Sequence, residues 1–170
     1  MLVRYNPINR DLNKEQLIML MQLSAFCEHH NFPLLFELLV PPTKAQESKT
    51  FDTKLRPKLA CEAIKEIQRF VKVSIWKIEG MSKQQWKEVI ATTESENPKP
   101  VFIVLGRNAP EKTVDAWLKA AKLPRVAGFA VGRTIFFKPL EAYLAGKMTR
   151  EQTVKSIAKS FRHFVDTWNR

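Results

Sequence analysis

Five strand-like apolar segments alternate with helical patterns along the whole chain, and this alternation restricts the fold more than any other feature. The segments are 2–5, 33–42, 72–78, 101–106 and 126–132. Strands that alternate with helices form parallel sheets, and strands that are apolar on both faces favour a sheet covered on both sides. The sequence therefore predicts an α/β domain, either a doubly wound sheet or a (β/α) barrel, and the periodicity does not choose between them.

Local signals place the helices between these strands. Serine, threonine or asparagine followed three residues later by glutamine predicts helix starts at Asn13, Ser82 and Thr149. Gly146 is a typical residue just beyond the end of a helix. The last helix is expected to bury one apolar stripe, formed by Val154, Ile157, Ala158, Phe161, Val165 and Trp168.

Length and charge limit the class of protein. The length of 170 residues suits a single domain that spans 1–170. The formal net charge of +11 suggests anionic partners. No basic run stands out, so a solvated basic surface is the first interpretation, a small anionic ligand the second, and nucleic acid an unlikely partner. No apolar run could cross a membrane and the start lacks a signal pattern, so we expect a cytoplasmic protein with no membrane partner. Cys27 and Cys61 are expected to be reduced thiols.

Two charged residues interrupt the second and third strands. Both predicted solutions bind ligands at the C-terminal ends of their strands. Alternation places Glu37 and Lys77 on one side of adjacent strands, where burial would favour a free amine that can form a Schiff base. The alternative is an ion pair between Lys77 and Glu37 or Glu79. No set of histidine, cysteine and carboxylate has metal spacing, so no metal is expected.

Two further segments offer sites for an anion. In "GFAVGRTIF", Gly132 and Arg133 follow the fifth strand, where an exposed backbone and a guanidinium can bind phosphate; the alternative is a tight turn with a surface arginine. In "LGRNAP", Gly106 and Arg107 follow the fourth strand. Arg107 either adds positive potential there or is a loop residue before a helix capped by Asn108.

The stretches "LVRYNP", "LLFELLVPP", "IWKIEG", "VLGRNAP" and "GFAVGRTIF" resemble a known family in the same order and over nearly the whole chain. The family is the aldolase-like C-terminal domain of bacterial 5-dehydro-2-deoxygluconokinase fusion proteins of myo-inositol catabolism, with a more distant likeness to class I tagatose-bisphosphate aldolases. The resemblance implies a lyase (class I aldolase) that uses a Schiff base and no cofactor. It assigns the imine-forming lysine to Lys77, proton transfer to Glu37 and phosphate binding to Arg133.

The same resemblance implies a (β/α)8 (TIM) barrel of which this chain has only the C-terminal five βα units, strands 4–8. A complete barrel needs about 200 residues or more. We therefore expect the open half to pair with a second copy or with a chain that supplies the missing half, or else to act as a non-catalytic phosphosugar-binding or regulatory module or a truncated relic. Gly80 departs from the family, where proline often follows the lysine and glutamate.

Overall fold

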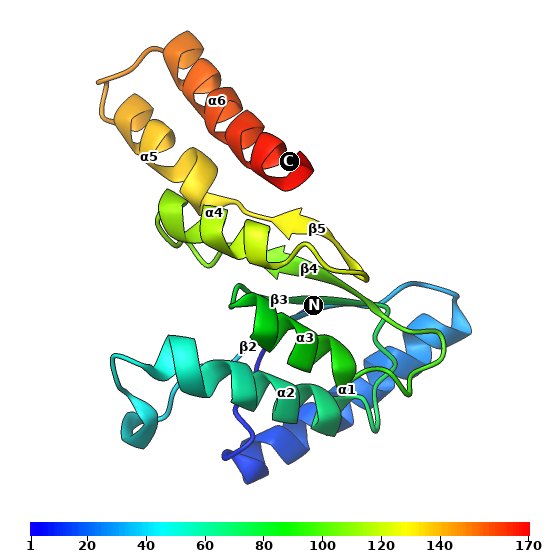
Figure 1. Cartoon of the computed structure of the whole chain (residues 1–170). Coiled ribbons are helices and arrows are strands. Elements are labelled where there is room, and N and C mark those ends of the chain that lie inside the picture. Colours follow the sequence, from blue (N-terminus) through cyan, green and yellow to red (C-terminus); the bar gives the residue numbers. More distant parts are fainter.

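The computed structural model describes all residues, 1–170, as a single parallel sheet with helices (Figure 1). The strands are β1 (Leu2–Arg4), β2 (Leu35–Leu39), β3 (Ile75–Glu79), β4 (Val101–Leu105) and β5 (Val126–Ala130). The helices are α1 (Arg10–His29), α2 (Arg56–Ile67), α3 (Lys83–Ala91), α4 (Glu111–Ala120), α5 (Arg133–Leu144) and α6 (Arg150–Asn169), with a short 3-10 turn η1 (Lys44–Gln46) and a π-helical turn η2 (Phe51–Leu55).

The five strands lie in sequential order, β1-β2-β3-β4-β5, and every neighbouring pair is parallel. A doubly wound sheet reverses its strand order at a switch point, and this sheet has no reversal. Right-handed crossovers between strands that always advance in the same direction place all connecting helices on one face. The strand order therefore excludes the doubly wound solution.

Burial along the strands shows that one face of the sheet is covered and the other is open. On the covered face Phe36, Leu38, Trp76, Phe102 and Val104 are at most 1% exposed. The intervening residues of β2, β3 and β4, Leu35, Leu39, Ile75, Val101 and Ile103, are only partly buried. We call this second side the open face. The expectation of a sheet covered on both sides is wrong, because all the crossover helices pack on one side.

Helices α5 and α6 form a hairpin that extends away from the rest of the molecule (Figure 1). The hairpin is anchored where Phe164 and Trp168 of α6 contact Phe129 of β5, with ring centroids 6.5 and 6.3 Å apart. The predicted apolar stripe of α6 is partly wrong, since Val154 and Phe161 are 51% and 53% exposed. The inward face is rotated to Thr153, Phe164 and Thr167.

Two of the three predicted helix starts are confirmed. Ser82 and Thr149 each accept a hydrogen bond from the backbone N–H three residues on, and Gly146 lies just beyond α5 with φ of 68°. The start predicted at Asn13 is wrong, because α1 begins at Arg10. The Asn13 side chain is buried and donates to the Asn6 carbonyl at 2.7 Å. No helix is long and apolar enough to span a membrane.

Candidate functional site

Lys77 and Glu37 meet on the open face. They are direct register partners on β3 and β2, and Lys77 Nζ donates to Glu37 Oε2 at 2.7 Å. Their side chains are 20% and 18% exposed, so a small molecule can reach them from the open face. The backbone register continues this row with Ile103 and Gly128 on one side and Leu2 on the other. The pair is therefore the one charged contact in an otherwise apolar row.

Arg4 is a further cation on the same face. Its register partner is Leu39, and alternation along β1 places Val3 with the covered face and Arg4 with the open one. Arg4 is exposed and forms no ion pair. The sequence analysis did not single it out, although the alternation of "LVRY" carries the signal.

Glu79, two residues beyond Lys77, is the centre of a second charged cluster at the C-terminal ends of β2–β4. Its carboxylate is 4% exposed and lies 3.0 Å from Arg107 Nε and 3.6 Å from Arg56 Nη1. The Val40 backbone N–H also donates to it at 3.4 Å. Burial raises the pKa of Glu79 against the attraction of the two arginines. Glu79 is therefore paired with Arg56 and Arg107 and is not the partner of Lys77.

Arg56 and Asp52 complete this cluster. Arg56 is 2% exposed and donates to the Gly80 carbonyl at 3.0 Å and to Asp52. Although burial acts to raise it, the pKa of Asp52 is lowered by hydrogen bonds and charge from Arg107 and by the charge of Arg56. Two arginines thus face two carboxylates, and the cluster carries no excess charge for an anion. No sequence pattern pointed to either residue. Asp52 lies in a segment that reads as a polar connector, and Arg56 is the first residue of α2.

This cluster forms one wall of a cavity of about 680 Å³ between the start of α3 and α4. Gly80 lies at the cavity and has no room for a side chain, because an added Cβ would lie 2.1 Å from the Trp117 ring. This contact explains why glycine is needed at position 80. Trp117 occupies the space that any larger residue would need.

The predicted anion residues lie in two neighbouring loops, since Gly106 packs against Val131 and the Thr134 hydroxyl donates to the Ala109 carbonyl at 2.9 Å. Arg107 turns back over Glu79 and Asp52, through a loop in which Arg107 and Asn108 have φ of 51° and 57°. Asn108 does not cap α4, whose N-cap is Pro110. Gly106 is buried, and an added Cβ would lie 3.0 Å from Val131, so its small size serves packing between β4 and β5.

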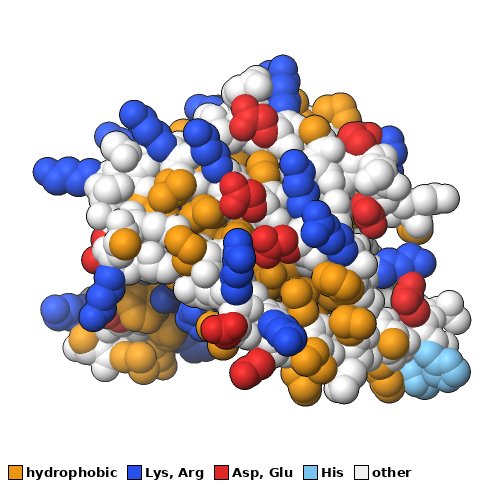
Figure 2. All heavy atoms as spheres, turned by 90° about the horizontal axis from the view of Figure 1, so that it is seen from below, with side chains coloured by type: hydrophobic (Ala, Val, Ile, Leu, Met, Phe, Trp, Pro, Cys, Tyr) orange, Lys and Arg blue, Asp and Glu red, His pale blue; other side chains and the backbone are white.

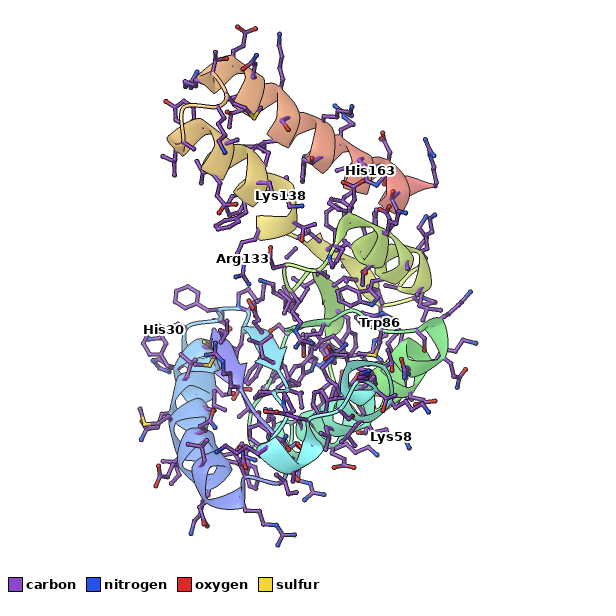
Figure 3. The ribbon with its side chains drawn as sticks, turned by 90° about the vertical axis from the view of Figure 1, so that its left-hand side faces the viewer. His30, Lys58, Trp86, Arg133, Lys138 and His163 are labelled. Carbon is purple, nitrogen blue, oxygen red and sulfur yellow. The ribbon has the colours of Figure 1, made fainter.

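Arg133 and Gly132 lie at the junction of β5 and α5. Gly132 is the N-cap of α5 and Arg133 is its first residue (Figure 3). The Arg133 side chain is exposed and forms no ion pair or side-chain hydrogen bond. The first amides of a helix of this length and a free guanidinium together attract anions. Of the predicted anion residues, Arg133 is thus the one cation still available to a ligand.

The fold and site define an open parallel α/β protein with a lysine–carboxylate pair on the uncovered face of its sheet. The chain belongs to the family described as "Uncharacterized protein conserved in bacteria (DUF2090)", whose profile matches residues 1–170. No curated protein matches the chain.

Proposed function

We propose that this chain is a class I aldolase-like protein that forms an imine between Lys77 and a phosphorylated sugar or keto acid. The observation that carries the proposal is the 2.7 Å contact of Lys77 Nζ with Glu37 Oε2 on a face that ligands can reach. An amine beside a carboxylate in apolar surroundings is the arrangement needed for imine chemistry with proton transfer. The resemblance to aldolase-like domains of myo-inositol catabolism supports the same assignment.

The proposal includes the fold type, a partial (β/α)8 barrel with five consecutive βα units. Sequential parallel strands with helices on one face are what such units have in a closed barrel. The open face of this sheet would correspond to the barrel interior, where Lys77 and Glu37 belong in an aldolase. The open face would then need a second copy or a partner chain to exclude water from the site.

The chemistry follows from the two side chains. Glu37 takes a proton from the Lys77 ammonium, and the free amine adds to the substrate carbonyl to give a carbinolamine. Glu37 returns the proton to the carbinolamine hydroxyl, which leaves as water and gives an iminium ion. Glu37 then removes the proton of the substrate's β-hydroxyl. The carbon–carbon bond breaks, and the iminium ion accepts the electron pair of that bond. An aldehyde leaves, and protonation and hydrolysis of the remaining enamine restore Lys77.

Arg133 supplies a phosphate site at a suitable separation. Arg133 follows β5, which is two strands from β3, or about 10 Å across the sheet at the usual strand spacing. The side chain of arginine can cover much of that distance, and the Arg133 guanidinium has no competing carboxylate. A keto sugar phosphate could then place its carbonyl at Lys77 and its phosphate at the start of α5.

Reductive trapping tests this proposal. Borohydride added with dihydroxyacetone phosphate should fix a substrate adduct on Lys77, and Lys77→Ala should abolish it. The exposed Lys72→Ala, whose ion pair with Glu28 lies on the surface, is the matched control and should retain the adduct. An adduct that survives Lys77→Ala would contradict the assignment.

A second function has support from the openness of the site. Because the open face is uncovered, water reaches Lys77 and Glu37. Water would hydrolyse an imine, so the chain could bind phosphosugars without turning them over. This alternative expects phosphate-ester binding that Arg133→Ala removes, with no borohydride adduct. Nucleic acid is not favoured, since Lys and Arg are interspersed with acidic side chains over the face seen in Figure 2.

A further inference from the structure

Three side chains of metal-ligating type converge where α6 crosses α4. Glu111 and Asp115 lie one turn apart on α4, and His163 reaches them from α6. Their ligand atoms all lie within 4.8 Å of one another. His163 Nε2 is 2.8 and 3.0 Å from the two Asp115 oxygens and 3.8 Å from Glu111 Oε1. Figure 3 shows His163 at this junction, away from Arg133.

The separations fit a small divalent cation. Zinc binds imidazole nitrogen and carboxylate oxygen at about 2.0–2.2 Å in tetrahedral geometry, which places neighbouring ligand atoms about 3.3–3.5 Å apart. The distances of 2.8 Å (His163 to Asp115) and 3.8 Å (His163 to Glu111) lie on either side of that value. Small side-chain rotations would therefore bring all three onto one ion, with water as a fourth ligand.

The local charge also favours a cation. The chain has 28 lysines and arginines, yet none forms an ion pair with Glu111 or Asp115. The only partner of either carboxylate among the ion pairs is His163. Two carboxylates without a fixed cation thus share one imidazole, which leaves a local negative charge unless a metal ion binds.

The Thr167 hydroxyl lies next to the Asp115 carboxylate. Thr167 Oγ1, one helical turn beyond His163, lies 3.5 Å from Asp115 Oδ1 and is buried with its residue 8% exposed. Groups that hydrogen-bond to a ligating carboxylate fix its orientation and strengthen metal binding. Asp115 is far apart in sequence from His163 and Thr167, so no spacing pattern links them.

We propose that Glu111, Asp115 and His163 bind a zinc-type divalent cation that fastens the α5–α6 hairpin to α4. The hairpin otherwise contacts the body through α4, through the Phe164 and Trp168 contacts with β5, and through the Thr134 hydroxyl, which donates to the Ala109 carbonyl at 2.9 Å. A cation between α4 and α6 adds a bond across this joint. It thereby fixes the hairpin that begins with Arg133. This site is independent of the proposed imine chemistry at Lys77.

The test is zinc titration of the untagged, chelator-treated full chain by calorimetry, with cobalt absorption as a report on ligand geometry. The expected result is one zinc per chain, a tetrahedral-type cobalt spectrum and a rise in melting temperature on zinc addition. His163→Gln and Asp115→Asn should each weaken binding at least tenfold and remove the thermal shift. Asp115→Asn keeps the shape of the side chain, so it serves if His163→Gln fails to fold.

His30→Gln is the matched control. His30 is exposed at the C-terminal end of α1, where its ring lies near Phe26 and Phe32, and this variant should bind zinc as the wild type does. Two results would overturn the proposal. One is the absence of stoichiometric zinc binding, which would leave a His163–Asp115 ion pair only. The other is binding that the His163 and Asp115 variants leave unchanged but His30→Gln removes.

Discussion

Glu37 and Lys77 are paired directly by the register of β2 and β3, and their carboxylate and amine lie 2.7 Å apart. If Glu37 moves protons for an imine on Lys77, Glu37→Gln should slow reductive trapping by about 10²-fold or more at neutral pH, because the amide cannot accept the ammonium proton. Trapping rates are measured by mass spectrometry of timed samples. Glu62→Gln, an exposed carboxylate on α2, should leave the rate unchanged.

The buried Glu79 should give stability a particular pH dependence. Its pKa is raised by burial, so the folded protein holds the proton more tightly than the unfolded chain, and Glu79 stabilises the fold in acid. This contribution is lost as pH rises from the ordinary value of 4.5 through the raised pKa. The wild type should therefore lose stability relative to Glu79→Gln as pH rises above the ordinary value of 4.5.

Urea unfolding of both proteins across that range measures this difference. The contribution of Asp52 to stability has the opposite pH dependence, because its pKa is lowered. That contribution is present above the ordinary value of 3.8 and is lost only as pH falls below it, outside the range of this experiment. A difference between the two proteins that stays constant, or grows in favour of the wild type, would contradict the buried-carboxyl interpretation.

Gly80→Ala should destabilise the fold. The added methyl would lie 2.1 Å from the Trp117 ring, and forcing the ring aside costs about 1–3 kcal/mol of unfolding free energy. Urea unfolding gives the value. In Gly132→Ala the new methyl would meet Phe136 at 3.4 Å, an ordinary contact, and little change is expected. Equal losses in the two variants would show that Trp117 is not the cause.

Thr149→Ala should lower the unfolding free energy by about 1 kcal/mol, because Thr149 caps α6 through the Gln152 backbone N–H. Thr50→Ala is the control, since Thr50 precedes η2 without a side-chain capping bond. Thermal or urea unfolding measures both. Should Thr50→Ala cost as much as Thr149→Ala, the capping interpretation of α6 would fail.

The sequence was informative where the signal is local and silent where it depends on three-dimensional position. The strands and the capping residues Ser82 and Thr149 could be predicted, because each depends on neighbouring residues. The adjacency of Glu37 and Lys77 followed from counting along two consecutive strands. The buried face of α6 was misjudged at Val154 and Phe161, because the helix packs through Thr153, Phe164 and Thr167.

The charged cluster was out of reach for a different reason. Glu79 gathers Arg56 and Arg107 from segments 23 and 28 residues away, so no spacing rule links them. The same holds for His163 and Asp115, which are 48 residues apart. Tertiary packing brings together the residues of the Glu79 cluster and the His163–Asp115 pair, and no pattern along the sequence indicates either contact.

Peptide mapping of the borohydride-trapped chain by mass spectrometry is the most direct test of the central claim. The folded protein is treated with dihydroxyacetone phosphate and borohydride, and sedimentation records its oligomeric state in the same sample. The account predicts one reduced adduct, located on the peptide that carries Lys77 and absent in Lys77→Ala. A folded chain without any adduct, or one with the adduct on another lysine, would contradict the proposed imine chemistry.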